Sequence, residues 1–163
     1  MDVTTMEQIT SLIKRLVKDS KSLPEPIELS FIRGDRFGWD HAARTITYDP
    51  MEGQVFTYLL HEYGHAILDH SDQSRDITLL EMERAAWDQA TILAPRYGGA
   101  IAEDVIETAL DTYRDWLHAR SNCIACGATG VQISEDTYQC ISCKTLWRVN
   151  DARSCALRRY QIK

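Results

Sequence analysis

The distribution of apolar residues predicts an α+β fold. Residues 27–31 and 44–48 alternate apolar and polar positions, as strands do, and we expect a further short strand to begin at Trp39. Three other stretches carry apolar residues at intervals of three or four, which places those residues on one face of a helix: 4–20, 77–94 and 100–119. A fourth helix, expected at 53–69, is apolar on most of its faces. This order predicts a small antiparallel sheet covered by helices.

The composition fits one ordinary domain with a small appendage. The chain has 163 residues, of which 44% are apolar, and this share supports a hydrophobic core. No apolar run reaches the length of about 18 residues that a membrane-spanning helix needs. The N-terminus lacks the basic and apolar segments of a signal peptide, so we expect a cytoplasmic protein without membrane contact.

Charge is unevenly distributed along the chain. Residues 1–119 carry 11 Lys and Arg against 21 Asp and Glu, whereas residues 120–163 carry 7 against 3. The first part is therefore acidic and the last part basic, which indicates different roles. The helical pattern also stops near Arg120, where cysteine, glycine and threonine become frequent. We expect two domains, residues 1–120 and 121–163.

The most informative motif is His61-Glu62-Tyr63-Gly64-His65, which has the form H-E-x-x-H. On a helix, His61 and His65 lie one turn apart on one face and can bind the same zinc ion. Glu62 then lies beside the metal and can take a proton from a zinc-activated water.

The same five residues also occur by chance on helices that bind nothing, with the two histidines at the surface. Here apolar residues flank the motif on both sides, so we expect its helix to be buried. Buried histidines and a buried carboxylate without partners would cost on the order of several kcal/mol. A bound metal supplies those partners, which favours the zinc interpretation.

A catalytic zinc usually has three protein ligands. The next helix, 77–94, offers Glu83 and Glu81, and Glu83 is the better candidate because small residues follow it and allow two helices to approach closely. His70 is the alternative. It follows His65 by five residues, about 140° around a helix, so the helix would have to end first.

The quoted residues resemble the ImmA/IrrE-type metallopeptidases, a compact gluzincin-like group within the zincin fold. The resemblance covers residues 1–96 and rests on Leu-Leu-His-Glu-x-Gly-His-Ala, followed by Glu83-Arg84-Ala85-Ala86-Trp87. It implies that Glu83 is the third ligand and that the enzyme cuts a specific protein, often a repressor, in bacteria or phages. Arg84, Asp88 and Pro95 depart from the family pattern.

Residues 121–163, which we call the cysteine module, contain two C-x-x-C pairs separated by 13 residues. Four thiolates at this spacing form a tetrahedral structural zinc site, so we expect a zinc ribbon with β-hairpins. Gly127 allows the tight turn after the first pair, and Cys155 is left over as a thiol outside the site. The four expected ligands are Cys123, Cys126, Cys140 and Cys143.

The role of the cysteine module stays open between a protein-docking appendage and a nucleic-acid contact. Lys144 and Arg148 lie near Trp147 and Tyr160, a mixture of basic and aromatic residues that suits nucleic acid. An H-E-x-x-H domain followed by a zinc ribbon also resembles SprT/Spartan-like proteases, which digest proteins crosslinked to DNA. The histidine-glycine pair that carries the third ligand in that family is missing here, which makes it the second choice.

We therefore predict a zinc-dependent endopeptidase with one catalytic and one structural zinc. Glu62 accepts a proton from the attacking water and delivers it to the leaving amine. The alternatives are a DNA-associated protease and a catalytically silent binding protein, and the intact Glu62 favours an enzyme. Tyr63, Tyr97 and His118 are candidate oxyanion donors, although each is more often structural. We expect the strand at 44–48 to form the edge that receives a peptide substrate.

Overall fold

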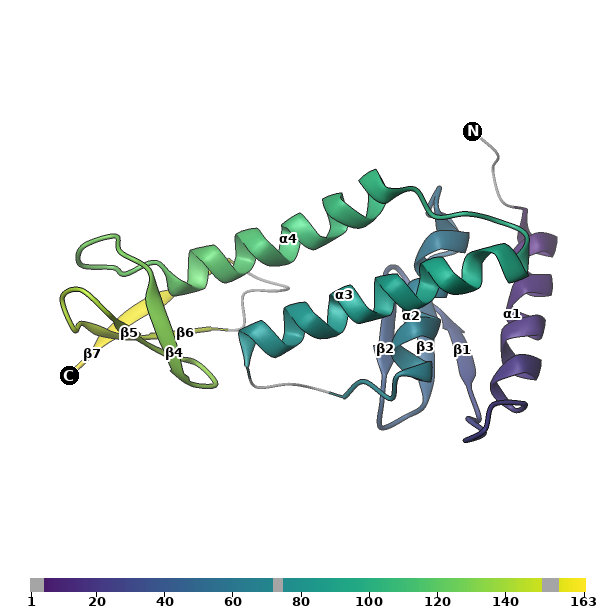
Figure 1. Cartoon of the computed structure of the whole chain (residues 1–163), viewed down its shortest axis with the longest axis horizontal. Coiled ribbons are helices and arrows are strands. Elements are labelled where there is room, and N and C mark those ends of the chain that lie inside the picture. The colour runs from purple at the N-terminus through teal and green to yellow at the C-terminus, as the bar shows by residue number, and fades with distance from the viewer. Residues whose placement is uncertain (1–4, 72–74, 151–155) are drawn as a thin grey trace. The chain divides into compact units, whose positions relative to one another are not determined.

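A computed structural model of the chain describes residues 5–71, 75–150 and 156–163 and divides them into two compact units (Figure 1). The first unit comprises Met1–Asp72 and Met82–Glu103, and the second comprises Gln73–Glu81 and Asp104–Lys163. The second unit thus groups the cysteine module with the preceding long helix. The domain boundary expected near Arg120 stays a prediction.

The first unit is built from helices and a three-stranded sheet, as the apolar pattern predicts. Helix α1 begins with a capping box, in which Thr5 accepts from the backbone of Gln8 and the Gln8 side chain accepts from the backbone of Thr5. The elements are α1 (Met6–Ser20), β1 (Ser30–Arg33), β2 (Gly38–Asp40), β3 (Thr45–Tyr48), α2 (Val55–Ile67), the part of α3 (Asp76–Leu93) from Met82 onward, and the 3-10 helix η1 (Ala94–Tyr97).

The sheet is mixed, with the strand order β1-β3-β2. Strand β3 is antiparallel to β2 but parallel to β1, so the expectation of an antiparallel sheet is wrong for the β1–β3 pair. The physical reason is that β3 inserts between its two predecessors and does not add outside β2. The central position of β3 also overturns the expectation that residues 44–48 form the substrate edge. The edges of this sheet are β1 and β2.

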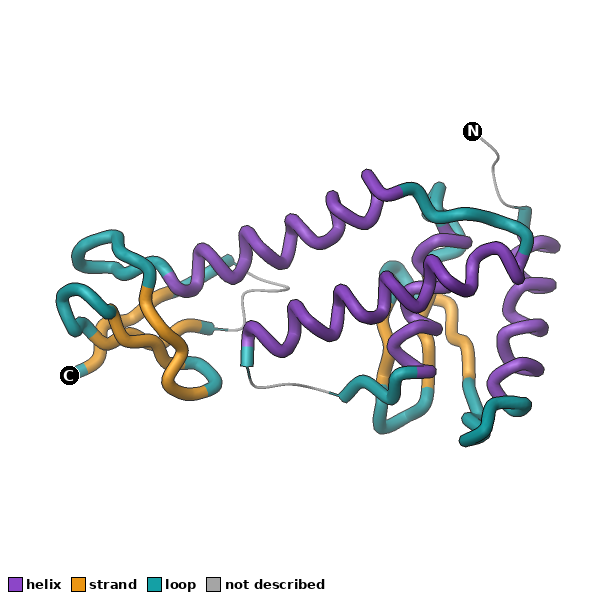
Figure 2. The backbone as a smooth tube through the Cα atoms, in the orientation of Figure 1, coloured by secondary structure: helices purple, strands orange, loops and turns teal. Residues whose placement is uncertain are grey.

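The core of the first unit lies between α1, the sheet and α2 (Figure 2). Ile46 of β3 and Leu59 and Leu60 of α2 are completely buried. Helix α2 is buried on most of its surface, as the apolar residues around the H-E-x-x-H motif predict. A Cβ at Gly64 of α2 would lie 2.6 Å from the carbonyl oxygen of Ala86 in α3, so the missing side chain permits this close approach.

The second unit contains α4 (Glu103–Ser121) and a four-stranded antiparallel sheet. The strands follow the chain in the order β4 (Gly130–Ser134), β5 (Thr137–Cys140), β6 (Leu146–Val149) and β7 (Arg159–Ile162). Tyr138 and Trp147 stack with 5.7 Å between their ring centroids and form the centre of a small core with two of the cysteines. The expected hairpin around the second C-x-x-C pair is formed by β5 and β6, and a single antiparallel bridge between Asn122 and Thr129 flanks the first pair.

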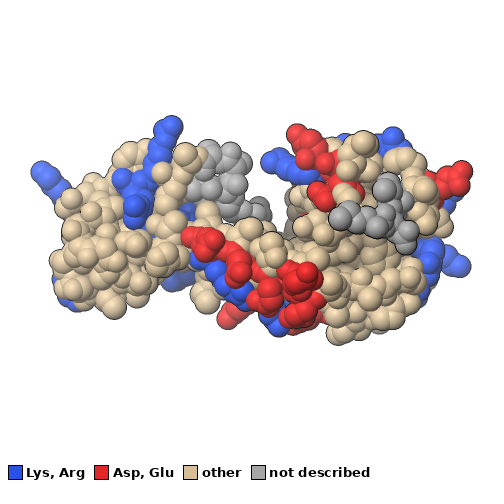
Figure 3. All heavy atoms as spheres, turned by 90° about the horizontal axis from the view of Figure 1, so that it is seen from above, with Lys and Arg blue, Asp and Glu red and all other residues tan. Residues whose placement is uncertain are grey.

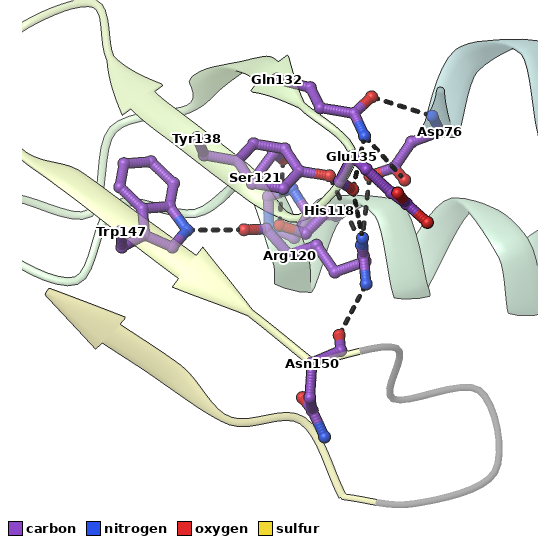
Figure 4. Close-up of polar contacts among 9 residues, drawn as sticks. All are labelled: Asp76, His118, Arg120, Ser121, Gln132, Glu135, Tyr138, Trp147 and Asn150. Atoms are coloured by element: carbon purple, nitrogen blue, oxygen red, sulfur yellow. Dashed lines mark hydrogen bonds and ion pairs between the residues drawn. The ribbon is translucent and has the colours of Figure 1, made fainter. Parts of the chain in front are cut away.

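Arg120, in the last turn of α4, joins the parts of the second unit (Figure 4). Its side chain is buried, with Nε 3.2 Å from the Asp76 carboxylate and an Nη donating to the carbonyl of Asn150 at 2.7 Å. Its own carbonyl accepts from the indole of Trp147 at 2.9 Å. The sheet, α4 and the first turn of α3 therefore converge on one residue.

No helix in the described part of the chain combines the length and the apolar character needed to cross a membrane.

Candidate metal centres

The H-E-x-x-H motif lies on α2, and its two histidines meet a glutamate from α3. His61 Nε2 and His65 Nε2 are 3.2 Å apart. The Oε2 atom of Glu83 lies 3.1 Å from His61 Nε2 and 3.5 Å from His65 Nε2. The three side chains are between 6% and 8% exposed, so this triangle of ligand atoms is buried.

The size of this triangle fits a zinc ion. Zinc–nitrogen and zinc–oxygen bonds of about 2.0–2.1 Å in a tetrahedron separate the ligand atoms by about 3.3–3.4 Å. The three observed separations, 3.1, 3.2 and 3.5 Å, lie on both sides of that value. The residues are therefore compatible with a metal site of two histidines and one glutamate, the donor set expected for a catalytic zinc.

The other two candidates for the third ligand lie outside the triangle. Glu81 is exposed to solvent, whereas Glu83 is 5% exposed. His70 contacts the Nδ1 atom of His65, whereas Glu83 faces the other ring nitrogen of His65, Nε2. The structure thus brings Glu83 together with His61 and His65, and it does not bring Glu81 or His70 into the same group.

Glu62 is buried beside these ligands and is not one of them. Burial raises the pKa of its carboxyl group above the ordinary value. His61 and His65 act in the opposite direction, as does a backbone hydrogen bond from Trp39. A carboxylate with a raised pKa accepts a proton more readily near neutral pH, which suits a general base.

Glu83 has the opposite balance. Burial by itself would raise the pKa of its carboxyl group, but the hydrogen bonds with His61 and His65 outweigh burial and hold the pKa well below its usual range. Glu83 therefore stays ionised, as a metal ligand must. The two buried glutamates of this centre differ in environment, and the difference matches their expected roles.

An aromatic side chain covers one face of the centre. Trp87 follows Glu83 by one helical turn and is 1% exposed. Its ring stacks on the imidazole of His61, with 4.0 Å between centroids and an interplanar angle of 22°. Trp87 therefore restrains the orientation of the His61 ring and keeps water from that side.

The structure gives Tyr63 and Tyr97 places in the core of the first unit. Their rings pack edge to face at 6.5 Å, and the Tyr97 hydroxyl donates to the Asp19 carboxylate of α1 at 2.8 Å. His118, the third expected oxyanion donor, belongs to the second unit. These observations support structural roles for the two tyrosines.

Sequence reasoning missed Trp39 of β2. Its indole donates to the carbonyl of His70 at 2.8 Å, and its backbone hydrogen-bonds Glu62. An isolated tryptophan in a short strand gives no sign of such contacts, because they depend on how β2 lies against α2.

Comparison with known proteins gives no match. Neither a protein-family model, nor a curated protein, nor a solved structure matches this chain. The resemblance to ImmA/IrrE-type and SprT/Spartan-like enzymes therefore remains a prediction.

The four cysteines of the cysteine module form a second candidate metal centre. Cys123 Sγ lies 3.7 Å from Cys143 Sγ, and Cys126 Sγ lies 3.5 Å from Cys140 Sγ. Zinc–sulfur bonds of about 2.3 Å in a tetrahedron separate the sulfurs by about 3.7–3.8 Å. The cluster is therefore compatible with structural zinc.

The two C-x-x-C turns have matching backbone geometry. Gly127 and Lys144 each follow the second cysteine of a pair, and both adopt left-handed φ values of 73° and 66°. The Thr145 hydroxyl beside Cys143 lowers the pKa of that thiol to about 6, which favours the thiolate that a metal requires. Lys and Arg side chains project from the module (Figure 3), and Cys155 lies outside the described residues.

Proposed function

We propose that this protein is a zinc-dependent endopeptidase that cleaves a specific protein partner and carries a second, structural zinc in the cysteine module. The observation that supports it best is the triangle of His61, His65 and Glu83, whose dimensions fit zinc, with Glu62 buried next to it. A carboxylate beside a zinc site of two histidines and one glutamate is an arrangement that can hydrolyse a peptide bond.

In this proposal each residue of the centre has one task. Zinc, when bound, supplies a Lewis acid that lowers the pKa of a water and stabilises the oxyanion. Glu62 accepts the proton of the attacking water and returns it to the leaving amine. Trp87 shields the centre and orients His61, and Glu83 stays ionised because the two histidines hold its pKa low.

Because β3 lies in the centre of the sheet, the edge strand β2 is a better candidate for substrate binding than β3. Trp39 of β2 hydrogen-bonds Glu62 through its backbone, so an extended peptide along this edge would pass close to the general base. Such β-augmentation selects a substrate by its sequence and extended conformation, in keeping with a narrow range of protein targets.

The test is cleavage of a mixed peptide library, followed by mass spectrometry. Wild-type protein loaded with zinc is compared with Glu62→Gln and with Arg84→Gln, a control at an exposed position of α3. We expect cleavage by wild type and Arg84→Gln, and loss of at least about 100-fold in Glu62→Gln, whose zinc content stays unchanged. Equal cleavage by Glu62→Gln would contradict the proposal.

A second candidate is a protease that acts on nucleic-acid-bound proteins. Tyr160 of β7 is 52% exposed and pairs in register with the exposed Arg148 of β6. An aromatic ring beside a cation is a stacking platform for single-stranded nucleic acid. Strong, salt-dependent binding of a labelled oligonucleotide, lost in Tyr160→Ala, would favour this candidate. Because cysteines used as metal ligands and not as disulfides are typical of reducing compartments, both candidates fit the cytoplasm.

A further inference from the structure

The chain turns back on α2 directly after the H-E-x-x-H motif. Asp69 adopts the left-handed conformation with φ 53°. Its N–H donates to the carbonyl of Ala66 at 3.2 Å, and the N–H of His70 donates to the carbonyl of His65 at 3.0 Å. These two hydrogen bonds define a Schellman motif, which ends a helix and folds the following residue over its last turn.

In a Schellman motif, the residue after the left-handed position packs against the side chain three residues before the helix end, usually through an apolar contact. Here those two residues are His70 and His65, and their rings lie 5.0 Å apart between centroids. The contact is polar, with 2.8 Å between the two Nδ1 atoms. The helix end therefore places one imidazole against a candidate metal ligand.

The 2.8 Å separation is that of a hydrogen bond and is too short for two ligands of one tetrahedral zinc, which lie about 3.3–3.4 Å apart. His65 meets Glu83 through Nε2, so a metal bound there leaves Nδ1 to carry the ring proton. That Nδ1–H then donates to the Nδ1 lone pair of His70.

Several contacts hold His70 in this place. The indole of Trp39 donates to the His70 carbonyl at 2.8 Å. The carboxylate of Asp69 is bound by Arg44 and lies 3.2 Å from Nε2 of His41. Residues from the sheet and its connecting turn thus fix the segment that carries His70.

The two histidine ligands differ in this respect. His61 Nδ1 is buried and has no hydrogen-bond partner among the described residues, and the ring is oriented by stacking on Trp87. His65 has an imidazole partner for the same atom. One ligand is positioned by packing and the other by a hydrogen bond.

We infer that His70 is a positioning residue, which accepts the Nδ1 proton of His65 and fixes the tautomer and ring orientation that present Nε2 to zinc. The inference rests on the proposed function, because it takes His61, His65 and Glu83 as a zinc site. Partners of this kind typically contribute about 10- to 100-fold to metal affinity. His70 thus belongs to the centre without being a ligand.

The test compares zinc affinities of the full-length protein by competition with a chromophoric chelator. His70→Asn keeps an acceptor oxygen near the position of Nδ1, whereas His70→Leu has a similar size and no acceptor. We expect His70→Leu to bind zinc at the weaker of the two sites about 10- to 100-fold less tightly. His70→Asn should stay within about threefold of wild type, because the hydrogen bond is retained.

Met51→Ala is the control, because the Met51 side chain is 86% exposed and lies outside the segment that carries His70, so its zinc affinity should match that of wild type. If His70→Leu does not fold, Trp39→Phe replaces it, because loss of the indole donor should also weaken zinc binding. Equal affinities for wild type and His70→Leu, or equally weak binding by Leu and Asn variants, would overturn the inference. Wild type that binds zinc only at the cysteines would instead overturn the proposed function.

Discussion

The carboxyl group of Glu62 is buried, and burial raises its pKa. In protein freed of zinc by a chelator, the folded-state pKa therefore lies above the unfolded value of 4.5. The contribution of this carboxyl group to the free energy of unfolding is fully present below pH 4.5 and is lost as pH rises through the folded-state pKa.

We predict that Glu62→Gln removes this loss, so that the zinc-free variant is more stable than zinc-free wild type at neutral pH. Thermal unfolding from pH 4 to pH 8 measures the difference. Identical pH profiles for the two proteins would show that Glu62 is not held in an unfavourable environment.

At this scale the sequence predicts what spacing controls. His61 and His65 must share a helix face at this separation, and the four cysteines must lie in two tight turns. The place of Trp39 beside Glu62 was beyond reach, because Trp39 comes from a distant strand. The contact of His70 with His65 needed the left-handed conformation of Asp69, which glycine would have signalled and aspartate does not.

Helices α2 and α3 meet at Gly64, where an added Cβ would lie 2.6 Å from the carbonyl oxygen of Ala86. Backbone cannot yield as a flexible side chain can, so Gly64→Ala must push the helices apart. We predict a loss of about 1–3 kcal/mol in the free energy of unfolding, together with weaker zinc binding because Glu83 moves away from the histidines.

Gly53→Ala is the matched control, because an added Cβ there meets nothing within 4 Å. Chemical denaturation of both variants, with zinc content measured alongside, tests the prediction. Equal stability of the two variants would mean that the helices do not depend on this contact.

The apolar pattern locates the helices to within a few residues, as for α2, predicted at 53–69 and observed at Val55–Ile67. The pattern does not predict how the sheet is assembled. Apolar and polar residues alternate in parallel and antiparallel strands alike, and the alternation does not indicate the order of the strands. The position of β3 between β1 and β2 is determined by tertiary packing. It makes β2, and not β3, the candidate edge for substrate binding.

In the second unit, the buried pair of Arg120 and Asp76 joins α4, the start of α3 and the sheet (Figure 4). Removing one partner leaves the other charge buried, so Arg120→Ala should lower the free energy of unfolding by about 3–5 kcal/mol. Arg114→Ala, on the same helix but with exposed ion pairs, should cost no more than about 1 kcal/mol. Equal losses would contradict the role assigned to Arg120.

For the whole molecule, we predict that one chain holds two zinc ions in sites of different kinds. One site lies beside a general base, and the other is formed by four cysteine thiolates. Each centre is built from residues of one unit, the histidines and Glu83 in the first and the four cysteines in the second, so each can be removed while the other stays. Zinc content per chain, measured in wild type, Glu83→Ala and Cys140→Ser, tests this most directly.

We predict two zinc ions in wild type and one in each variant, the remaining ion being the cysteine-bound one in Glu83→Ala and the histidine-bound one in Cys140→Ser. One zinc in wild type, lost only in Cys140→Ser, would show that the H-E-x-x-H centre binds no metal. That result would contradict the account and would favour the alternative of a binding protein that recognises partners without cutting them.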